Sequence, residues 1–309
     1  MRAVILGGTG AIGGAAAARL AASGCEVEVT GRNPASMPAE LPARGVHFHS
    51  IERSDVEAIG RLVGDDSALL VDLLAYRAAD VRALLPAMGS VGSTVIISTR
   101  AVYVDADGRH VNGHDAPRFP VPITESMPTV RPADGVDPFS REGYAPSKVA
   151  VEQVALGSGL PITVIRPSKV HGRWARNPRT RSFVESMMRG EQKIELAARG
   201  ESIDHLTAAS NTAALIATVA TLPGARILNS ADPDAPSAEQ IVRAIALRVG
   251  WNGALDLLGG AADPLRGRHP WMTAHPIVLD TSASTRLGYA PAGTGLALLA
   301  EEIDWIAAQ

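Results

Sequence analysis

The sequence predicts an α/β protein built on a parallel sheet that helices cover on both faces. Two observations support this prediction. Short, continuous apolar runs alternate with helical patterns through the first half of the chain, and a glycine-rich turn joins the first run to the first helix. Strands that are buried on both faces read as unbroken apolar runs. At 309 residues the chain exceeds the usual size of a single core, which favours a second, smaller domain.

The expected elements of the large domain follow one another at short intervals. Apolar runs predict strands at Ala3–Leu6, Val27–Thr30, Val46–Phe48, Ala68–Asp72 and Thr94–Ser98. Helical spacing of apolar residues predicts helices at Gly13–Ser23, Asp55–Val63 and Ala78–Met88. Two later runs, at Ile162–Pro167 and Arg226–Asn229, predict further strands. The order of strands and helices is typical of a doubly wound sheet.

The composition changes after Gly172. We expect residues 1–171 to form the large domain and residues 172–309 most of the smaller one, with the strand at 226–229 returning to the large sheet. Helices are predicted near Thr207–Thr221, Ala238–Val249 and Leu296–Ala308. A group of arginines in this part could bind phosphate or carboxylate or could form a solvated face: Arg173, Arg176, Arg179, Arg181 and Arg199. Residues 104–138 contain six prolines and predict either a lid or a disordered insertion.

The bulk properties argue against several classes of partner. A net charge of −3 with no basic run argues against nucleic acid. The longest apolar run is short and contains Asp72, so no membrane span is expected. A single cysteine, Cys25, excludes an internal disulfide and fits a reducing cytoplasm. His110 and His114 lie in the proline-rich segment, where their spacing does not make a helical ligand pair, so no metal site is expected.

A glycine-rich turn, "LGGTGAIGG", follows the first strand and opens the first helix. Gly7, Gly10 and Gly13 are spaced three apart, and five glycines lie within residues 7–14. Glycine permits the tight turn and lets backbone amides approach a pyrophosphate, which the free N–H groups of the helix N-terminus can bind. Because the required strand and helix are both present, the turn predicts a Rossmann-type dinucleotide-binding domain rather than a merely structural turn.

The end of the second predicted strand bears on the choice of dinucleotide. An acidic residue there favours NAD, because it accepts a hydrogen bond from the ribose 2′-hydroxyl. This chain reads "VEVTGRNP", with Glu28 inside the strand and Arg32 just beyond its tip. An arginine at that place can pair with a 2′-phosphate, so the sequence favours NADP over NAD. The alternative is a solvated surface arginine.

Tyr144 and Lys148 lie four residues apart in the helical pattern "REGYAPSKVAVE" and share one face of that helix. Free tyrosine titrates near pKa ~10, and a neighbouring ammonium is expected to lower the pKa so that the hydroxyl exchanges a proton with a substrate. "VIISTRAVY" ends the fifth strand and brings Ser98 and Thr99 to the carboxyl edge, where such sheets bind ligands. A surface tyrosine and lysine on an amphipathic helix are the alternative.

These motifs together resemble the extended short-chain dehydrogenase/reductase family, of the NAD-dependent epimerase/dehydratase type. The matching segments are "GGTGAIGG", "IISTRAVY", "YAPSK", "VIRPSKVHG" and "LDTSASTRLGY", in the family's order over nearly the whole chain. The resemblance implies a Rossmann-type domain, a smaller substrate-binding domain and hydride transfer between a nicotinamide cofactor and a small molecule, phosphorylated or nucleotide-linked substrates included. It also leaves a homodimer open.

The resemblance implies roles for individual residues. Tyr144 would be the catalytic acid/base, Lys148 would hold the nicotinamide ribose, and Thr99, with Ser98 as the fallback, would bind the reacting oxygen. The implied cofactor-binding residues are Gly7, Thr9, Gly10, Ala11, Ile12, Gly13, Arg32, Ile51, Ala75, Tyr144, Lys148, Pro167 and Val170.

Departures from the family pattern narrow the expected activity. Arg100-Ala101 follow Thr99 where 4,6-dehydratases have Asp-Glu, which argues against that chemistry. Lys169 stands where sugar-nucleotide epimerases often have Asn. We therefore expect an NADP(H)-dependent oxidoreductase that interconverts a ketone and a secondary alcohol. The alternatives are a sugar-nucleotide epimerase with a tightly bound cofactor and, in a different class, a non-catalytic dinucleotide sensor.

Overall fold

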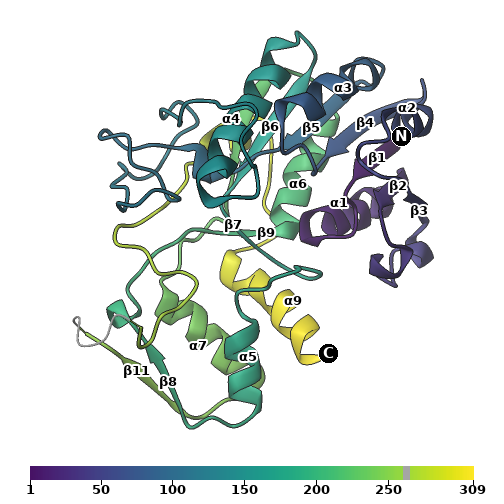
Figure 1. The fold of residues 1–309 in the computed structure, drawn as a ribbon. Coiled ribbons are helices and arrows are strands. Elements are labelled where there is room, and N and C mark those ends of the chain that lie inside the picture. The colour runs from purple at the N-terminus through teal and green to yellow at the C-terminus, as the bar shows by residue number, and fades with distance from the viewer. Residues whose placement is uncertain (260–264) are drawn as a thin grey trace.

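A seven-stranded, fully parallel sheet forms the frame of the larger body in the computed structural model, which describes residues 1–259 and 265–309 (Figure 1). The strands lie in the order β10-β6-β5-β4-β1-β2-β3. Their bounds are β1 Arg2–Leu6, β2 Glu26–Gly31, β3 Val46–Ser50, β4 Ser67–Asp72, β5 Ser93–Ile97, β6 Ile162–Pro167 and β10 Arg226–Ser230. Because β2 and β4 lie on opposite sides of β1, the chain reverses direction across the sheet there, which is where such folds bind ligands. The predicted fold class is confirmed.

Helices cover both faces of this sheet. One face carries α2 (Val56–Val63), α3 (Ala78–Gly89) and α4 (Arg141–Gly157), and the other carries α1 (Ala11–Ala22) and α6 (Ala209–Ala220). The place of α6 differs from the sequence-based expectation, which assigned the helix near 207–221 to the smaller domain. Nine of its twelve residues are buried, because α6 packs against both α1 and the sheet.

The smaller body lies below the sheet in Figure 1. Its helices are α5 (Arg181–Met188), α7 (Ala238–Val249) and α9 (Gly295–Ala307), and its parallel strand pair is β8 (Lys193–Leu196) with β11 (Ala254–Leu257). Their apolar faces enclose a separate core around Trp271. Another parallel pair, β7 (Lys169–His171) with β9 (Leu206–Ala208), joins the two bodies, and the short α8 (Ser282–Arg286) packs on β10. The division at residue 171 stays a prediction.

Residues 104–138 pack against the larger body with little regular structure. Phe119 and Ile123 join Tyr103 and Leu279 in a small core cluster. The carboxylate of Asp105 accepts hydrogen bonds from backbone N–H groups of residues 107, 109 and 118, which fixes the start of the segment. The segment is therefore an ordered part of the fold, and its action as a lid stays untested. Within the described residues, no helix has both the length and the apolarity to cross a membrane.

A buried ion pair ties α4 to the sheet. Both carboxylate oxygens of Glu152 on α4 accept hydrogen bonds from the guanidinium of Arg166 on β6, with the Nε contact at 2.9 Å. Both side chains are nearly inaccessible to solvent. Burying two charges is costly, so removal of one partner leaves the other charge uncompensated.

We predict that Glu152→Gln lowers the free energy of unfolding by about 3–5 kcal/mol, because Arg166 stays charged and buried. Urea denaturation measures this, and an unchanged m value would show that only stability has changed. Glu57→Gln is the matched control, since Glu57 forms an exposed i,i+4 pair with Arg61 at 3.8 Å. Its loss should change stability by less than about 0.5 kcal/mol. Equal effects of the two substitutions would contradict the prediction.

Candidate active site

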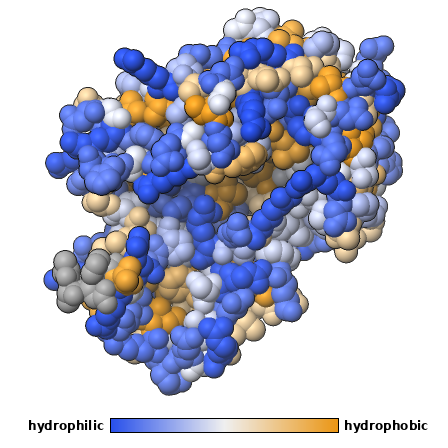
Figure 2. Space-filling model, viewed as in Figure 1, coloured by the Kyte–Doolittle hydropathy of each residue, from blue (hydrophilic) through white to orange (hydrophobic). Residues whose placement is uncertain are grey.

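A cavity of about 900 Å³ lies along the carboxyl edge of the sheet. Loops that follow β1, β2, β3, β4 and β7 line it, together with Ile97 at the end of β5. Figure 2 shows the surface hollowed here, between the larger and the smaller body. The position agrees with the ligand site expected where a doubly wound sheet reverses its strand order.

The glycine turn forms one wall of the cavity. Gly7 has φ of +90°, a conformation that favours glycine. A Cβ atom on Gly13 would lie 2.5 Å from the carbonyl oxygen of Gly7, so only glycine allows this close packing, whereas a Cβ on Gly10 would meet no protein atom within 4 Å. No side chain caps α1 and no acid lies in its first turn. Free N–H groups at an open helix N-terminus suit a phosphate.

Arg32 lines the cavity just beyond the tip of β2. Glu28, the acid inside this strand, binds elsewhere: its oxygens lie 2.5 Å from His49 Nε2 and 3.4 Å from His47 Nδ1. Burial raises the pKa of Glu28, but the two imidazoles outweigh burial and hold that pKa below its usual value. Among the described residues, no carboxylate lies within 4.0 Å of the Arg32 guanidinium, which is exposed. The strand tip therefore presents a positive charge to the cavity.

Lys148 is buried on α4 and bridges two strand ends. Its ammonium donates hydrogen bonds of 2.8 Å to the carbonyls of Ala75 and Ile97, and it lies 4.7 Å from the centre of the Tyr76 ring. Ile97 and Tyr76 both line the cavity, which puts Lys148 directly behind its wall. Burial lowers the pKa of Lys148 to about 8, against the opposing effect of Asp72 and Glu152.

Tyr144 lies one turn before Lys148 on α4, whose N-terminus is capped by the Ser140 hydroxyl. Burial raises the pKa of Tyr144, and a hydrogen bond with the Thr99 hydroxyl lowers it by less. This direction is opposite to the sequence-based expectation that the ammonium of Lys148 lowers the pKa. The reason is geometric, since the ammonium is held by two backbone carbonyls and Tyr144 is desolvated. The structure does bring Thr99 and Tyr144 together.

Ser98, the expected alternative to Thr99, has another partner. Its hydroxyl donates a 2.5 Å hydrogen bond to Glu152, in the buried pair with Arg166. Thr99 instead caps the 3-10 turn Arg100–Val102 by accepting a hydrogen bond of 3.1 Å from the N–H of Ala101. This bond uses an oxygen lone pair and leaves the Thr99 O–H as a donor, which favours Thr99 over Ser98.

Comparison with protein families gives a match over residues 3–229 to the model described as the NAD dependent epimerase/dehydratase family. The chain belongs to this family. Comparison with curated proteins finds no match.

Solved structures with the same fold match this chain over its whole length. UDP-glucose 4-epimerase from Thermotoga maritima, with UDP-glucose, has a TM-score of 0.72 at 18% identity and covers 100% of this chain and 99% of that chain. dTDP-glucose 4,6-dehydratase from Bacillus anthracis, in complex with NAD, has a TM-score of 0.73 at 16% identity and covers 100% and 97%. dTDP-glucose 4,6-dehydratase from Streptomyces venezuelae has a TM-score of 0.72 at 19% identity and covers 100% of this chain and 98% of that chain. At these identities the likeness shows a shared fold.

Most of the implied cofactor residues of this epimerase/dehydratase-family chain meet in the cavity: Gly7, Thr9, Gly10, Ala11, Ile12, Gly13, Arg32, Ile51 and Val170 line it. Thr99, Ala75, Tyr144, Lys148 and Pro167 are not among the lining residues. Ala75 is fully buried, with its carbonyl bound to Lys148, and Pro167 is buried at the end of β6. The roles of all these residues stay predictions, although the open helix N-terminus and the glycine geometry fit a dinucleotide.

The sequence did not point to several other wall residues. Tyr76 and Phe139 pack at the cavity with ring centres 5.0 Å apart and ring planes tilted by 49°. Of the arginine group, Arg176 and Arg179 line the cavity, whereas Arg173 pairs with Glu40 and Arg181 with Glu185. No local pattern separates the two kinds of arginine, because the distinction depends on the loop after β7.

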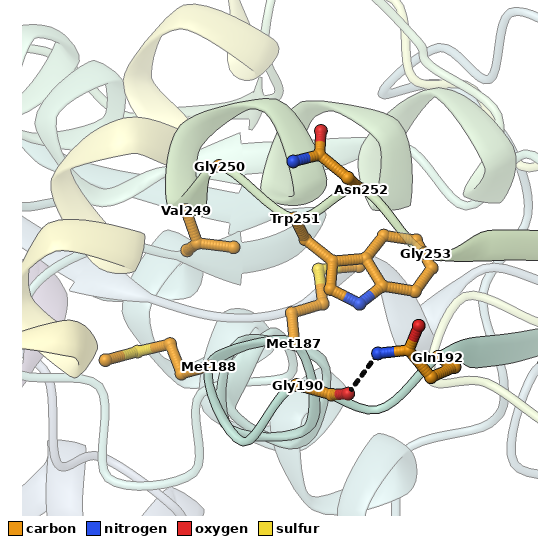
Figure 3. A pocket seen from close by; sticks show the side chains of 9 residues that line it. All are labelled: Met187, Met188, Gly190, Gln192, Val249, Gly250, Trp251, Asn252 and Gly253. Atoms are coloured by element: carbon orange, nitrogen blue, oxygen red, sulfur yellow. Dashed lines mark hydrogen bonds between the residues drawn. The ribbon is translucent and has the colours of Figure 1, made fainter.

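Two further features lie away from this site. A cavity of about 410 Å³ in the smaller body, between α5 and α7, has no ionisable side chain in its wall; Trp251, Met187 and Gln192 are drawn in Figure 3. Glu26, Glu28 and His47 come close enough to share a cation, but Glu28 is already bound by two histidines. Neither feature includes a residue of the candidate active site.

We predict that Tyr144→Phe lowers turnover by at least ~100-fold while the fold and dinucleotide binding are kept, because a positioned proton donor is lost. Steady-state rates and cofactor titration measure the two effects. Tyr289→Phe serves as the control, since Tyr289 is also buried but belongs to the core around α1 and α6. Near-normal turnover by a folded Tyr144→Phe protein would remove Tyr144 from the mechanism.

Proposed function

We propose that this protein is an NADP(H)-dependent oxidoreductase that interconverts a ketone and a secondary alcohol with Thr99, Tyr144 and Lys148. The observation that carries the proposal is the meeting of Thr99 and Tyr144 beside a cavity with a glycine-turn phosphate site. Lys148, fixed behind the same wall, completes the set. These positions suit proton transfer next to a dinucleotide.

In the reducing direction the hydroxyls of Thr99 and Tyr144 donate hydrogen bonds to the substrate carbonyl oxygen. A reduced nicotinamide dinucleotide held by the glycine turn and Lys148 would supply the hydride for the carbonyl carbon. Negative charge then develops on oxygen, and Tyr144 transfers its proton there, so that ketone, hydride and proton give the alcohol. A raised pKa keeps Tyr144 protonated at neutral pH, which suits it to donate. Lys148 stays hydrogen-bonded to the carbonyls of Ala75 and Ile97, which fixes the helix that carries Tyr144, and it would hold the nicotinamide ribose, as the family resemblance implies.

The preference for NADP is supported by the charge at the tip of β2. Arg32 faces the cavity without a carboxylate partner among the described residues, while Glu28 is held by His47 and His49. No acid therefore takes the place that binds a 2′-hydroxyl in NAD-dependent proteins. Relatives of the same fold bind NAD, and NAD is the alternative cofactor.

A sugar-nucleotide epimerase is the second candidate. It is favoured by the solved structure of an epimerase with UDP-glucose, which shares the fold over 99% of its length. The same three residues would serve, with the cofactor regenerated in each cycle. A 4,6-dehydratase is disfavoured because Arg100, whose guanidinium lies 2.6 Å from Asp204, stands where that chemistry needs a carboxylate. A dinucleotide sensor has no need of a buried lysine beside a tyrosine. A homodimer stays a prediction from the resemblance.

We predict that wild-type protein binds NADPH more tightly than NADH and that Arg32→Ala removes this difference. Loss of a charge-assisted pair with the 2′-phosphate should weaken NADPH binding by about 10-fold or more and leave NADH binding nearly unchanged. Titration of both cofactors measures this. Arg44→Ala is the control, because Arg44 is exposed on the neighbouring turn Pro42–Arg44 and lies outside the cavity. A wild-type preference for NADH would contradict the assignment.

We predict that one cofactor is consumed for each product formed. Absorbance of the reduced nicotinamide, followed beside product formation with any substrate that turns over, measures the ratio. A ratio of one supports net reduction or oxidation. Product that forms with catalytic cofactor and no net absorbance change would replace this proposal with the epimerase.

A further inference from the structure

Three cations gather beside Thr99 around a single acid. Arg100 Nη1 lies 2.6 Å from Asp204 Oδ1, and the ammonium of Lys169 contacts Oδ2 of the same carboxylate. Arg179 lies on the cavity wall, where its Nη1 donates a hydrogen bond of 3.1 Å to the carbonyl of Val170. Among the described residues, no other carboxylate lies within 4.0 Å of these three side chains. The cluster therefore carries more positive than negative charge.

The excess positive charge lies where solvent exposure is low. The side chains of Arg100 and Lys169 are 11% and 13% exposed, and that of Asp204 is 2% exposed. Like charges in such surroundings repel, and accordingly burial and the charge of Arg100 both lower the pKa of Lys169, against the effect of Asp204. Uncompensated charge at low exposure is costly, and it is characteristic of sites that bind an ion of opposite sign.

Hydrogen-bond donors are also left over. Arg100 Nη1 is buried and makes no aligned hydrogen bond despite its ion pair. Lys169 uses its ammonium for Asp204 and for the carbonyl of Pro270, and a lysine has three N–H donors. Arg179 uses one of five. Each of the three residues can therefore offer an N–H group to a further acceptor.

The cluster lies at the reacting end of the cavity. Arg100 directly follows Thr99, and Lys169 directly precedes Val170 in the wall. Thr99 follows β5 and Lys169 follows β6, whereas Arg32 follows β2, three and four strands away in the sheet. With neighbouring strands about 4.8 Å apart, these separations are roughly 14 and 19 Å. An anion in this cluster is thus far from the place proposed for the cofactor 2′-phosphate.

We propose that Arg100, Lys169 and Arg179 bind a compact anionic group of the substrate, a carboxylate or a phosphate ester, close to the carbonyl that Thr99 and Tyr144 polarise. Asp204 holds Arg100 and Lys169 in place and limits the net charge. The substrate class is then a small keto or hydroxy compound that bears its own anion. This inference rests on the proposed function for the identity of the reacting carbonyl.

The test measures anion binding without turnover. Malonate, inorganic phosphate and UDP are titrated separately by calorimetry into protein saturated with NADP⁺, at constant ionic strength so that general screening does not vary. Malonate or phosphate should bind wild-type protein and bind at least ~10-fold more weakly to Lys169→Gln and Arg179→Gln, since each loses a charge-assisted hydrogen bond. Asp204→Asn should bind the same anion more tightly, which a merely structural role of the cluster does not predict.

Controls separate the sources of the anion. Arg181→Gln removes one positive charge from an i,i+4 pair outside the cluster and should leave the binding unchanged. Arg179 is exposed, so its replacement is expected to keep the fold, and its variant decides the test if Lys169→Gln does not fold. Equal anion binding by Arg179→Gln and wild type would overturn the proposal. So would an equal loss of NADP⁺ affinity in the variants, which would assign the cations to the cofactor. Binding of UDP alone at the cluster would assign them to a nucleotide diphosphate.

The outcome is independent of the cofactor stoichiometry. If malonate and phosphate do not bind, the proposed anion site is wrong, and the proposal of net hydride transfer is unaffected. Product formed without net consumption of cofactor would contradict the proposed oxidoreductase activity, and the measured anion binding would still stand.

Discussion

The ammonium of Lys148 holds together the parts of the candidate active site. It binds the carbonyl that follows β4 and the carbonyl that ends β5, so α4 is fixed against two neighbouring strand ends. A buried ammonium is tolerated only where acceptors and counter-charges surround it, and two carbonyls, the face of Tyr76 and the field of Asp72 supply them here. Tyr144, one turn away on the same helix, takes its position relative to Thr99 from this anchor.

A second set of buried polar contacts, distinct from those of Lys148, supports the end of β5. The Ser98 hydroxyl binds Glu152, Glu152 binds Arg166, and Arg166 lies over the ring of Tyr103, 4.8 Å from its centre. The Tyr103 hydroxyl continues the chain of contacts to Asn229 on β10 at 2.6 Å. Such a network is stable only when each buried member has a partner, and it links α4 through β5 and β6 to the outer strand. Positions in the candidate active site thus depend on residues that do not line the cavity.

Much of the frame could be predicted from the sequence, because its signals are local. Unbroken apolar runs located the strands, and the strand, glycine turn and helix at the N-terminus located one wall of the cavity that we propose binds a dinucleotide. Contacts between residues distant in the sequence could not be predicted, because no local signal indicates them. Nothing near Arg100 indicates that Asp204 will face it, and the pairing of Glu152 with Arg166 depends on how α4 lies on β6. The predicted direction of the shift in the Tyr144 pKa was wrong, because helical spacing cannot show that backbone carbonyls bind the ammonium of Lys148.

The outermost strand of the large sheet has a consequence for how the protein is made. β10 pairs along β6 from Arg226 to Ser230, yet the chain between these strands contributes α5, β8 and other parts of the smaller body. A nascent chain that has left the ribosome only as far as β6 therefore presents that strand as an open edge, which can recruit strands from other chains. The part of the larger body that is synthesised first therefore lacks the seventh strand of its sheet. The seventh strand is added only after α5 and β8 of the smaller body have been translated.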